Sequence, residues 1–297
     1  MKRKLVFIHG RSQQNKDSVA LKAEWVHSWV DGLEKSGLEM PLADTDIRFP
    51  YYGDTLEGLI EGKPDDQVAE VIVRGTMSEN TPERQFMSEV LEEVRKKAGI
   101  TPKRLAALSS QEVVQRGVLN WEWVQTILKA IDRHVPLGSG AGVAIATYDV
   151  YQYLNNKVTA KRINDGVIKA FDAADEMVVV AHSLGTVVAY NLLSGLGKER
   201  GWKVPLFVTV GSPLAVTAIK RSLPRREVPS CVGQWFNAMD DRDVVALYPL
   251  DKTNFDVSPG VIENKTDVRN PTENRHGISG YLGDRVVARR ICEAINA

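Results

Sequence analysis

Short apolar runs limit most strongly what this chain of 297 residues can fold into. Three of them cover residues 5–8, 177–180 and 206–210, and each is followed within three residues by Gly or Ser. Apolar residues on consecutive positions are typical of strands that are buried on both faces of a parallel sheet. Residues 234–239, which include Trp235 and Phe236, are a fourth candidate strand.

Helical patterns lie between these candidate strands. In residues 18–36 a four-residue spacing places Trp25, Trp29 and Leu33 on one face of a helix. Further helical patterns cover residues 159–173, 185–196 and 285–295. Strands that alternate with helices predict the α/β class, with a mostly parallel central sheet and helices on both faces.

The middle of the chain follows a different pattern, from about residue 55 to about residue 155. Apart from an ambiguous run at 71–73, it contains no convincing buried strand, and residues 136–140 form a break rich in Gly and Pro. We predict one domain over residues 1–297 that carries residues 55–155 as a helical insertion, a cap or lid. Its expected helices cover residues 83–98, 111–119, 121–134 and 142–154.

Charge and composition exclude several classes of function. The 38 basic and 38 acidic residues cancel, so no strong field favours nucleic acid or an anionic membrane as a partner. No segment approaches the ~18 uncharged apolar residues that span a bilayer, and the first apolar run is shorter than a signal-peptide core. We expect a cytoplasmic protein without a transmembrane segment. Cys231 and Cys292 lack metal-ligand spacing and are expected to be buried free thiols.

The strongest chemical signal is Ser183, which follows the candidate strand at 177–180 and precedes a helical pattern. A sharp strand-to-helix turn presents a serine at the carboxyl edge of a sheet, and it needs small residues two positions before and after the serine. Ala181 and Gly185 meet this requirement. We predict that Ser183 is a nucleophile, and a serine hydroxyl at neutral pH needs a base to act as one.

Five histidines could supply the base: His9, His27, His134, His182 and His276. The side chain next to the serine points away from it on such a turn, which argues against His182. His27 and His134 lie in helical patterns and are better explained as surface or core residues. His276 lies in a loop ahead of the last helix, downstream of a plausible acid, and is the predicted base.

The acid that orients the base is expected just beyond the strand at 234–239. Asp243, followed by two valines, fits this place best. Asp240 is the alternative, although it could instead brace the loop by accepting hydrogen bonds from backbone amides. The order Ser183, Asp243, His276 is the order of nucleophile, acid and base expected of a serine hydrolase with an α/β sheet.

Backbone amides must also stabilise the negative charge that such a reaction places on the substrate oxygen. We predict one donor in the amide of Leu184, directly after the nucleophile. The other is expected from the loop after the first strand, where Gly10 permits a tight backbone that directs the amide of Arg11, or that of Ser12, into the site. His9 would then shape this loop without taking part in the chemistry.

Five segments together resemble those of α/β-hydrolase lipases and esterases. They are Ile-His-Gly-Arg at 8–11, Ala-His-Ser-Leu-Gly at 181–185, Val-Gly-Ser-Pro-Leu at 210–214, Asp-Arg-Asp-Val-Val at 241–245 and Arg-His-Gly-Ile at 275–278. The resemblance covers the sheet-forming two-thirds of the chain and does not extend to residues 55–155. It implies hydrolysis of a carboxylic ester in a small-molecule acyl substrate through a covalent acyl-enzyme, without metal or organic cofactor.

Other functions remain open at this point. The same residues could serve an acyltransferase, a thioesterase or an amidase, and a binding protein could use the same scaffold without turnover. A nucleotide-binding protein is disfavoured, because no Gly-x-Gly-x-x-Gly segment follows the first strand. Ser212 could lie at a pocket rim or simply in a turn. Five aromatic residues could line an acyl pocket or pack in the core: Trp121, Trp123, Tyr148, Tyr151 and Tyr153.

Overall fold

A computed structural model describes residues 3–10, 17–58, 81–108, 121–135, 139–224 and 226–297. Its centre is a sheet of six strands, all parallel, in the order β2-β1-β3-β4-β5-β6. The strands are β1 (Lys4–Ile8), β2 (Ile47–Arg48), β3 (Glu176–His182), β4 (Lys203–Val210), β5 (Val232–Ala238) and β6 (Ile262–Lys265).

All four strands predicted from the sequence are present, as β1, β3, β4 and β5. The α/β class and the parallel sheet are therefore confirmed. The two edge strands, β2 and β6, were not predicted, because they are only 2 and 4 residues long and carry no recognisable periodicity. The strand order is not the typical order of an α/β-hydrolase sheet, so the sheet by itself does not identify that fold.

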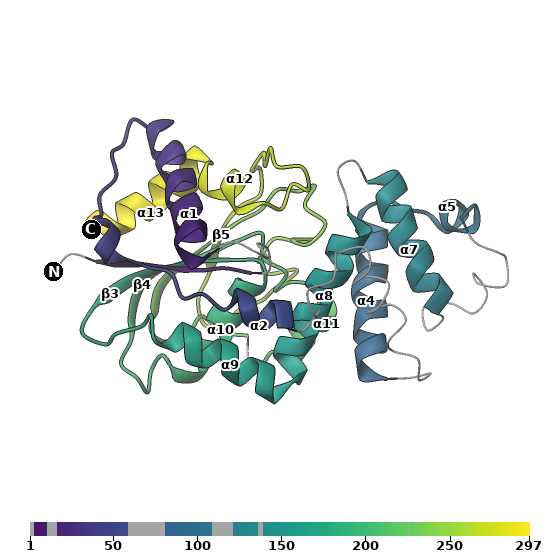
Figure 1. Cartoon of the computed structure of the whole chain (residues 1–297), viewed down its shortest axis with the longest axis horizontal. Coiled ribbons are helices and arrows are strands. Elements are labelled where there is room, and N and C mark those ends of the chain that lie inside the picture. The colour runs from purple at the N-terminus through teal and green to yellow at the C-terminus, as the bar shows by residue number, and fades with distance from the viewer. Residues whose placement is uncertain (1–2, 11–16, 59–80, 109–120, 136–138, 225) are drawn as a thin grey trace.

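Helices cover both faces of the sheet (Figure 1). On one face lie α1 (Ser18–Glu34), α12 (Ile278–Leu282) and α13 (Arg285–Asn296), which enclose a hydrophobic cluster with one set of alternating strand side chains. In this cluster Phe7 of β1 meets Trp25 of α1 edge to face at 5.2 Å. On the other face lie α9 (Lys157–Ile168) and α10 (Leu184–Leu196).

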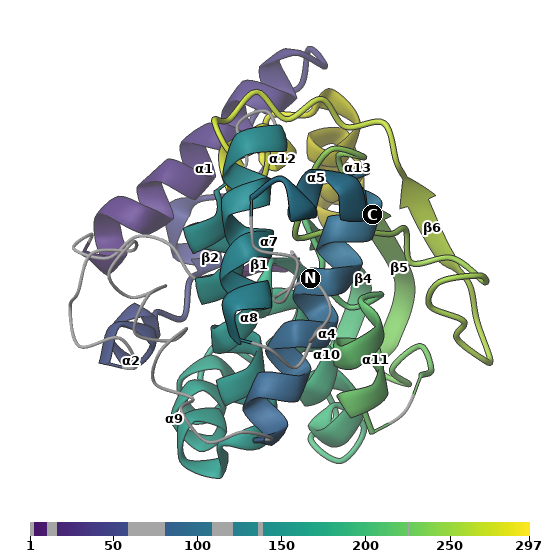
Figure 2. The ribbon, with the colours of Figure 1, turned by 90° about the vertical axis from the view of Figure 1, so that its right-hand side faces the viewer.

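A group of helices stands beyond the carboxyl ends of the strands (Figures 1 and 2). It includes α4 (Pro82–Lys97), α5 (Pro102–Ala106), α7 (Trp121–His134) and α8 (Gly140–Asn155). Thr81 and Thr101 cap α4 and α5, each ahead of a proline in the first turn. Side chains of these helices and of the sheet belong to one hydrophobic cluster.

The helices predicted at 83–98, 121–134 and 142–154 are thus present, as α4, α7 and α8. The short helices α2 (Gly53–Gly58) and α11 (Thr217–Ser222) were not predicted. The expected helix at 111–119 and the ambiguous run at 71–73 lie outside the described residues, as do residues 136–138 of the predicted break.

The strand order fixes where a ligand site is expected. From β1 the chain continues to β2 on one side, and it later returns to β3 on the other side of β1. Such a reversal leaves a crevice between the carboxyl ends of the two central strands, which is where parallel sheets bind their ligands. By this rule the ligand site is expected between the ends of β1 and β3, where residues 9–10 follow β1 and Ser183 follows β3.

Three further observations bear on the predictions about the whole chain. None of the helices in the described ranges is both long enough and apolar enough to cross a membrane. Within the same ranges, no three His, Cys, Asp or Glu side chains gather in a way that could hold a metal ion. Cys231 and Cys292 are both unpaired; Cys292 is buried, whereas Cys231 is only partly buried.

Candidate active site

Ser183 lies at the sharp turn between β3 and α10, with backbone angles φ 55° and ψ −129°. Residues other than glycine rarely adopt this conformation, which costs on the order of 1–3 kcal/mol. Hydrogen bonds hold the turn in place. The Ser183 amide donates to the carbonyl of Val210 at 3.3 Å, and the Ser183 carbonyl accepts from the amide of Thr186 at 2.9 Å and from its hydroxyl at 2.7 Å.

Two glycines allow the turn to lie against the end of β1. A Cβ on Gly185 would lie 2.3 Å from the carbonyl oxygen of Ile8, so any larger residue would push the helix away from the strand. A Cβ on Gly10 would lie 2.7 Å from the Cβ of Ser183 and 3.1 Å from the amide nitrogen of Leu184. The loop after β1 can therefore approach the serine only because residue 10 has no side chain.

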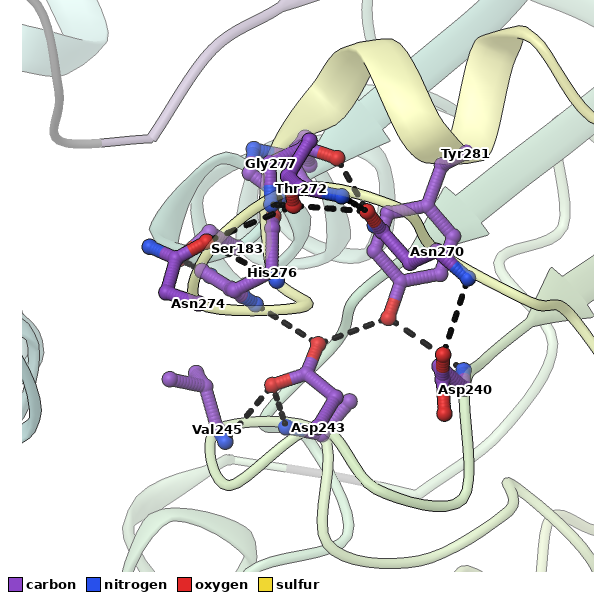
Figure 3. Close-up of polar contacts among 12 residues, drawn as sticks. Ser183, Asp240, Asp243, Val245, Asn270, Thr272, Asn274, His276, Gly277 and Tyr281 are labelled. Atoms are coloured by element: carbon purple, nitrogen blue, oxygen red, sulfur yellow. Dashed lines mark hydrogen bonds and ion pairs between the residues drawn. The ribbon is translucent and has the colours of Figure 1, made fainter. Parts of the chain in front are cut away.

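His276 lies in the loop before α12, and its ring joins the serine to a buried carboxylate (Figure 3). Its Nε2 is 2.9 Å from Oγ of Ser183, and its Nδ1 is 2.7 Å from Oδ2 of Asp243. Because an ionised carboxylate only accepts hydrogen bonds, Nδ1 carries the proton in the neutral ring and Nε2 is left to accept the serine proton. The structure thus brings together three residues predicted from the sequence, in a continuous line.

Asp243 is buried, and both of its carboxylate oxygens are occupied (Figure 3). Oδ1 accepts from the amides of Val245 at 2.8 Å and Ala246 at 3.3 Å, while Oδ2 accepts from His276 and from the hydroxyl of Tyr281 at 2.6 Å. Burial by itself raises the pKa of this carboxyl, but the charge and hydrogen bond of His276 and the other donors together hold the pKa below its ordinary value.

Asp240, the alternative acid, braces the acid loop. Its carboxylate accepts from the backbone amide of Arg242 at 2.9 Å, from Nε of the same residue at 2.8 Å, and from the amide of Asn270 at 2.9 Å. Burial raises its pKa, and these hydrogen bonds outweigh burial and lower the pKa. Of the two aspartates, Asp243 is therefore the one that can orient the imidazole.

The loop that carries His276 is fixed by side chains that the sequence did not reveal. The Asn270 side chain donates to the carbonyl of Gly277 at 2.8 Å and accepts from the hydroxyl of Thr272 at 2.6 Å. The side chain of Asn274 accepts from the amide of His276 at 3.1 Å. Since Asn270 also donates its amide to Asp240, the base loop and the acid loop are connected (Figure 3).

The ring of His182, which precedes the serine, contacts the main chain of His276, the predicted base. Its Nε2 lies 2.7 Å from the carbonyl oxygen of His276, and the two rings are 4.7 Å apart. Burial and the neighbouring His276 lower the pKa of His182 to about 3, so the ring is neutral and its Nε2 proton is donated to that carbonyl. The sequence predicted only that this side chain points away from the nucleophile, and this contact was not predicted.

The remaining histidines make other contacts. His9 donates from Nδ1 to the carbonyl of Gly10 at 2.6 Å, accepts from the amide of Tyr52 at 3.2 Å, and stacks on the Tyr52 ring at 4.0 Å. Burial lowers its pKa to about 4. These contacts fit the predicted structural role. The side chain of His27 on α1 is 79% exposed, and His134 lies at the end of α7.

Of the two predicted oxyanion donors, only the amide of Leu184 lies within the described residues. Leu184 is the first residue of α10, a helix of 13 residues, so its amide belongs to the positive end of the helix dipole. Arg11 and Ser12, the candidates for the second donor, lie outside the described residues. The second donor therefore stays a prediction, which the close approach of Gly10 to Leu184 supports.

A narrow, partly open pocket borders Ser183. It is almost entirely apolar. The described residues that line it besides Ser183 come from α4, α8, α11 and the loops after β4 and β5: Val90, Val94, Val143, Ala146, Thr147, Val150, Pro213, Val216, Ile219, Val244, Val245 and Leu247.

Four of the five aromatic residues proposed as a pocket lining are not among the described residues of this wall. Trp123 and Tyr153 are buried in the core, and Tyr148 and Tyr151 pack against it; for Trp121 only the backbone is described. Ser212 lies in a turn, where its hydroxyl accepts a hydrogen bond from the amide of Leu214 at 3.3 Å.

Comparisons of the chain with protein-family models, with curated proteins and with solved structures find no match. What the site can do therefore has to follow from the geometry of its own residues.

Proposed function

We propose that the protein is a serine hydrolase that cleaves carboxylic esters through an acyl-enzyme. The observation that supports this most directly is the continuous line of hydrogen bonds from Asp243 through His276 to Ser183, at 2.7 and 2.9 Å. The serine stands in a conformation that L-residues avoid, which is typical of functional sites. Together these features match the requirements of an activated nucleophile.

In the proposed acylation, Oγ of Ser183 attacks the carbonyl carbon of the ester while Nε2 of His276 takes the serine proton. The carbonyl oxygen becomes negatively charged, and the amide of Leu184 donates a hydrogen bond to it, together with the predicted amide of Arg11. Asp243 stabilises the protonated imidazole. When the tetrahedral intermediate collapses, His276 returns the proton to the departing alcohol, and the acyl group stays on Ser183.

Deacylation repeats these steps with water as the nucleophile. Nε2 of His276 takes a proton from the water as its oxygen attacks the acyl carbon, and the same amides stabilise the second intermediate. Collapse releases a carboxylic acid and gives the proton back to Oγ of Ser183. The site is then ready for another ester, and no cofactor is needed.

The apolar pocket beside Ser183 suits the acyl side of the substrate. Aliphatic side chains surround it, and the single polar wall residue apart from Ser183, among those described, is Thr147, whose hydroxyl already donates to the carbonyl of Val143 at 2.7 Å. A charged acid would lose its hydration there without gaining a partner. We therefore propose an uncharged aliphatic acyl group.

The helices beyond the carboxyl edge are proposed to act as a cap over this pocket. Two side chains on one face of α4 attach it to α11: Glu93 accepts from the amide and hydroxyl of Thr217 at 3.0 and 3.1 Å, and Glu89 pairs with Arg221. Val90 and Val94, each directly after one of these glutamates in sequence, line the pocket. With the serine turn and the Ser–Asp–His order, this arrangement supports a variant of the α/β-hydrolase fold.

Hydrolysis of p-nitrophenyl esters of increasing chain length tests the proposal. The wild-type protein is expected to turn over these esters, whereas Ser183→Ala should lose at least about a thousandfold in kcat/KM because no nucleophile remains. The matched control is Ser28→Ala, which removes another buried serine hydroxyl, one that donates within α1 to the carbonyl of Glu24 at 2.8 Å. Equal turnover by wild type and Ser183→Ala would disprove the function.

A further inference from the structure

Tyr281 occupies a position between the two aspartates of the acid loop that the proposed reaction does not explain. It belongs to α12, five residues after His276, and its side chain is completely buried. Its hydroxyl lies 2.6 Å from Oδ2 of Asp243 and 3.3 Å from the amide nitrogen of Asp240 (Figure 3).

The direction of both hydrogen bonds follows from the chemistry of the groups. A phenol has one proton, and an ionised carboxylate can only accept, so the Tyr281 hydroxyl donates to Asp243 and accepts from the amide of Asp240. Burial and the Asp243 charge raise the pKa of Tyr281 well above its ordinary value, so the hydroxyl keeps its proton. It donates to Oδ2, the same oxygen that binds Nδ1 of His276.

Two consequences follow for the carboxylate. Together with the amides of Val245 and Ala246 on Oδ1, the tyrosine fixes the rotation of the Asp243 side chain. A second donor on Oδ2 also withdraws charge from the atom that stabilises the imidazolium, and a less basic oxygen holds that cation less tightly.

The other described ionisable groups around Asp243 and His276 do not donate a second hydrogen bond to Oδ2 of Asp243. His182 faces His276 at 4.7 Å and Tyr281 at 6.0 Å between ring centres, and its ring is neutral. His9 lies farther along the same sheet edge and is also neutral, because burial lowers its pKa. The carboxylate of Asp240 is paired with Arg242.

We propose that Tyr281 is a positioning residue that holds the Asp243 carboxylate and sets the pH below which the Ser183–His276 pair stops working. This inference rests on the proposed hydrolase function for its meaning, but its physical content, the coupling of Tyr281 to the Asp243–His276 pair, can be measured without turnover.

Tyr281→Phe is the direct test. Oδ2 loses one donor, becomes more basic and holds the protonated imidazole more tightly, so the midpoint of the His276 titration followed by NMR should rise by roughly 0.5 pH unit. The acidic limb of kcat/KM should move by the same amount. The less restrained carboxylate should also lower kcat about tenfold.

Tyr190→Phe is a closely matched control. Tyr190 is also completely buried, and its hydroxyl likewise donates one hydrogen bond and accepts another, in this case to the carbonyl and from the amide of Glu227, both at 3.1 Å. The control should lose stability as Tyr281→Phe does, while the midpoint of His276 and the acidic limb stay where they are in the wild type.

A second variant covers the case in which Tyr281→Phe does not fold. Replacement of Tyr281 by 3-fluorotyrosine keeps the hydroxyl and makes it a stronger donor, so the His276 midpoint should move to lower pH, opposite to the phenylalanine variant. A midpoint that stays at the wild-type value in both variants, or in the fluorotyrosine variant if only that one folds, would overturn the inference.

The outcomes separate the inference from the proposed function. If the midpoints move in the expected directions and the acidic limb follows them, the inference holds together with the function. If the midpoints move but the wild-type protein hydrolyses no ester, the coupling of Tyr281 to the pair holds and the function fails. If the wild-type protein is active and the midpoints do not move, the function holds and the inference fails.

Discussion

The hydroxyl of Thr186 donates to the carbonyl of Ser183 at 2.7 Å and so holds the residue with φ 55° in place. Since Thr186 uses its proton in this bond, the hydroxyl of Ser212, 2.8 Å away, must donate to Thr186. The amide of Leu214 donates in turn to Ser212 at 3.3 Å. A chain of donors from the loop after β4 thus supports the strained turn.

This strain predicts an unusual difference in stability. Ser183→Gly and Ser183→Ala both remove the hydroxyl, but glycine adopts φ 55° without the steric cost that alanine retains. After the greater entropy of glycine in the unfolded chain is subtracted, Ser183→Gly should be more stable than Ser183→Ala by about 1 kcal/mol. Urea denaturation of the two inactive variants measures this difference.

The control for this prediction is Ala189→Gly, in the interior of α10. There the backbone is helical, so glycine should destabilise the protein by about 1 kcal/mol or more. If Ser183→Gly were also less stable than Ser183→Ala, the turn would not be under the strain inferred from its backbone angles.

Removal of the acid and of the loop brace should have different effects. Asp243→Asn places a donor or a neutral oxygen against Nδ1 of His276, disfavours the required tautomer, and should lower kcat by about 10³–10⁴-fold while the protein stays folded. Asp240→Asn leaves that contact intact but weakens the bonds to Arg242 and Asn270. It should chiefly lower the unfolding free energy, by about 1–3 kcal/mol.

Kinetics on the folded fraction and denaturation curves of both variants distinguish these effects. The opposite pattern, with kcat abolished by Asp240→Asn and preserved in Asp243→Asn, would show that Asp240 and not Asp243 is the acid.

Two buried histidines predict acid sensitivity of the fold. The pKa of His9 is lowered to about 4 and that of His182 to about 3, whereas an unfolded histidine titrates near its ordinary value of 6.5. Between pH 6.5 and 5 the unfolded chain therefore binds more protons than the folded one. The free energy of unfolding keeps its full value above this window. Within the window it should fall, as the pH drops, by about 1.4 kcal/mol per pH unit for each histidine.

Urea denaturation at several pH values measures this slope. His9→Asn, whose amide can keep the donor to the carbonyl of Gly10, should remove about half of it. His27→Gln, at an exposed position, should leave it unchanged. A slope that His9→Asn does not alter would show that His9 is not held neutral by burial.

The pocket predicts a dependence on acyl-chain length. Ala146 of α8 lines the wall, and Ala146→Leu would fill part of the space. The ratio of kcat/KM for an octanoate ester to that for an acetate ester should fall about tenfold or more, since several methylenes lose burial at ~0.8 kcal/mol each. Ala106→Leu, exposed on α5, is the control. Equal losses for both esters would place the acyl chain elsewhere.

The sequence predicted those parts of the fold that depend on local pattern. Val179 and Val180 belong to a consecutive apolar run, and Ser183 with Gly185 forms a motif of fixed spacing, so both a strand and the turn after it could be expected. Residues 47–48 and 262–265 are too short or too polar to show a period, and strand order leaves no local trace at all. Local sequence preference cannot predict edge strands that form only because they pair with a neighbouring strand.

The candidate site was predictable to the same extent. Ser183, Asp243 and His276 could be found because their chemistry requires these residue types in this order. Tyr281, Thr186 and the other supporting residues could not, since a tyrosine in a short helix or a threonine in a helical first turn is ordinary. Their roles arise only when folding brings α12 and the loop after β4 to the carboxyl edge of the sheet.

The most direct test of the account is labelling with a fluorophosphonate probe, followed by mass mapping of the adduct. The wild-type protein should carry one adduct on Ser183, and the adduct should be absent from both Ser183→Ala and His276→Ala, because the serine reacts only when the imidazole takes its proton. Absence of an adduct on folded wild-type protein, or equal labelling of His276→Ala, would contradict an activated serine at this site.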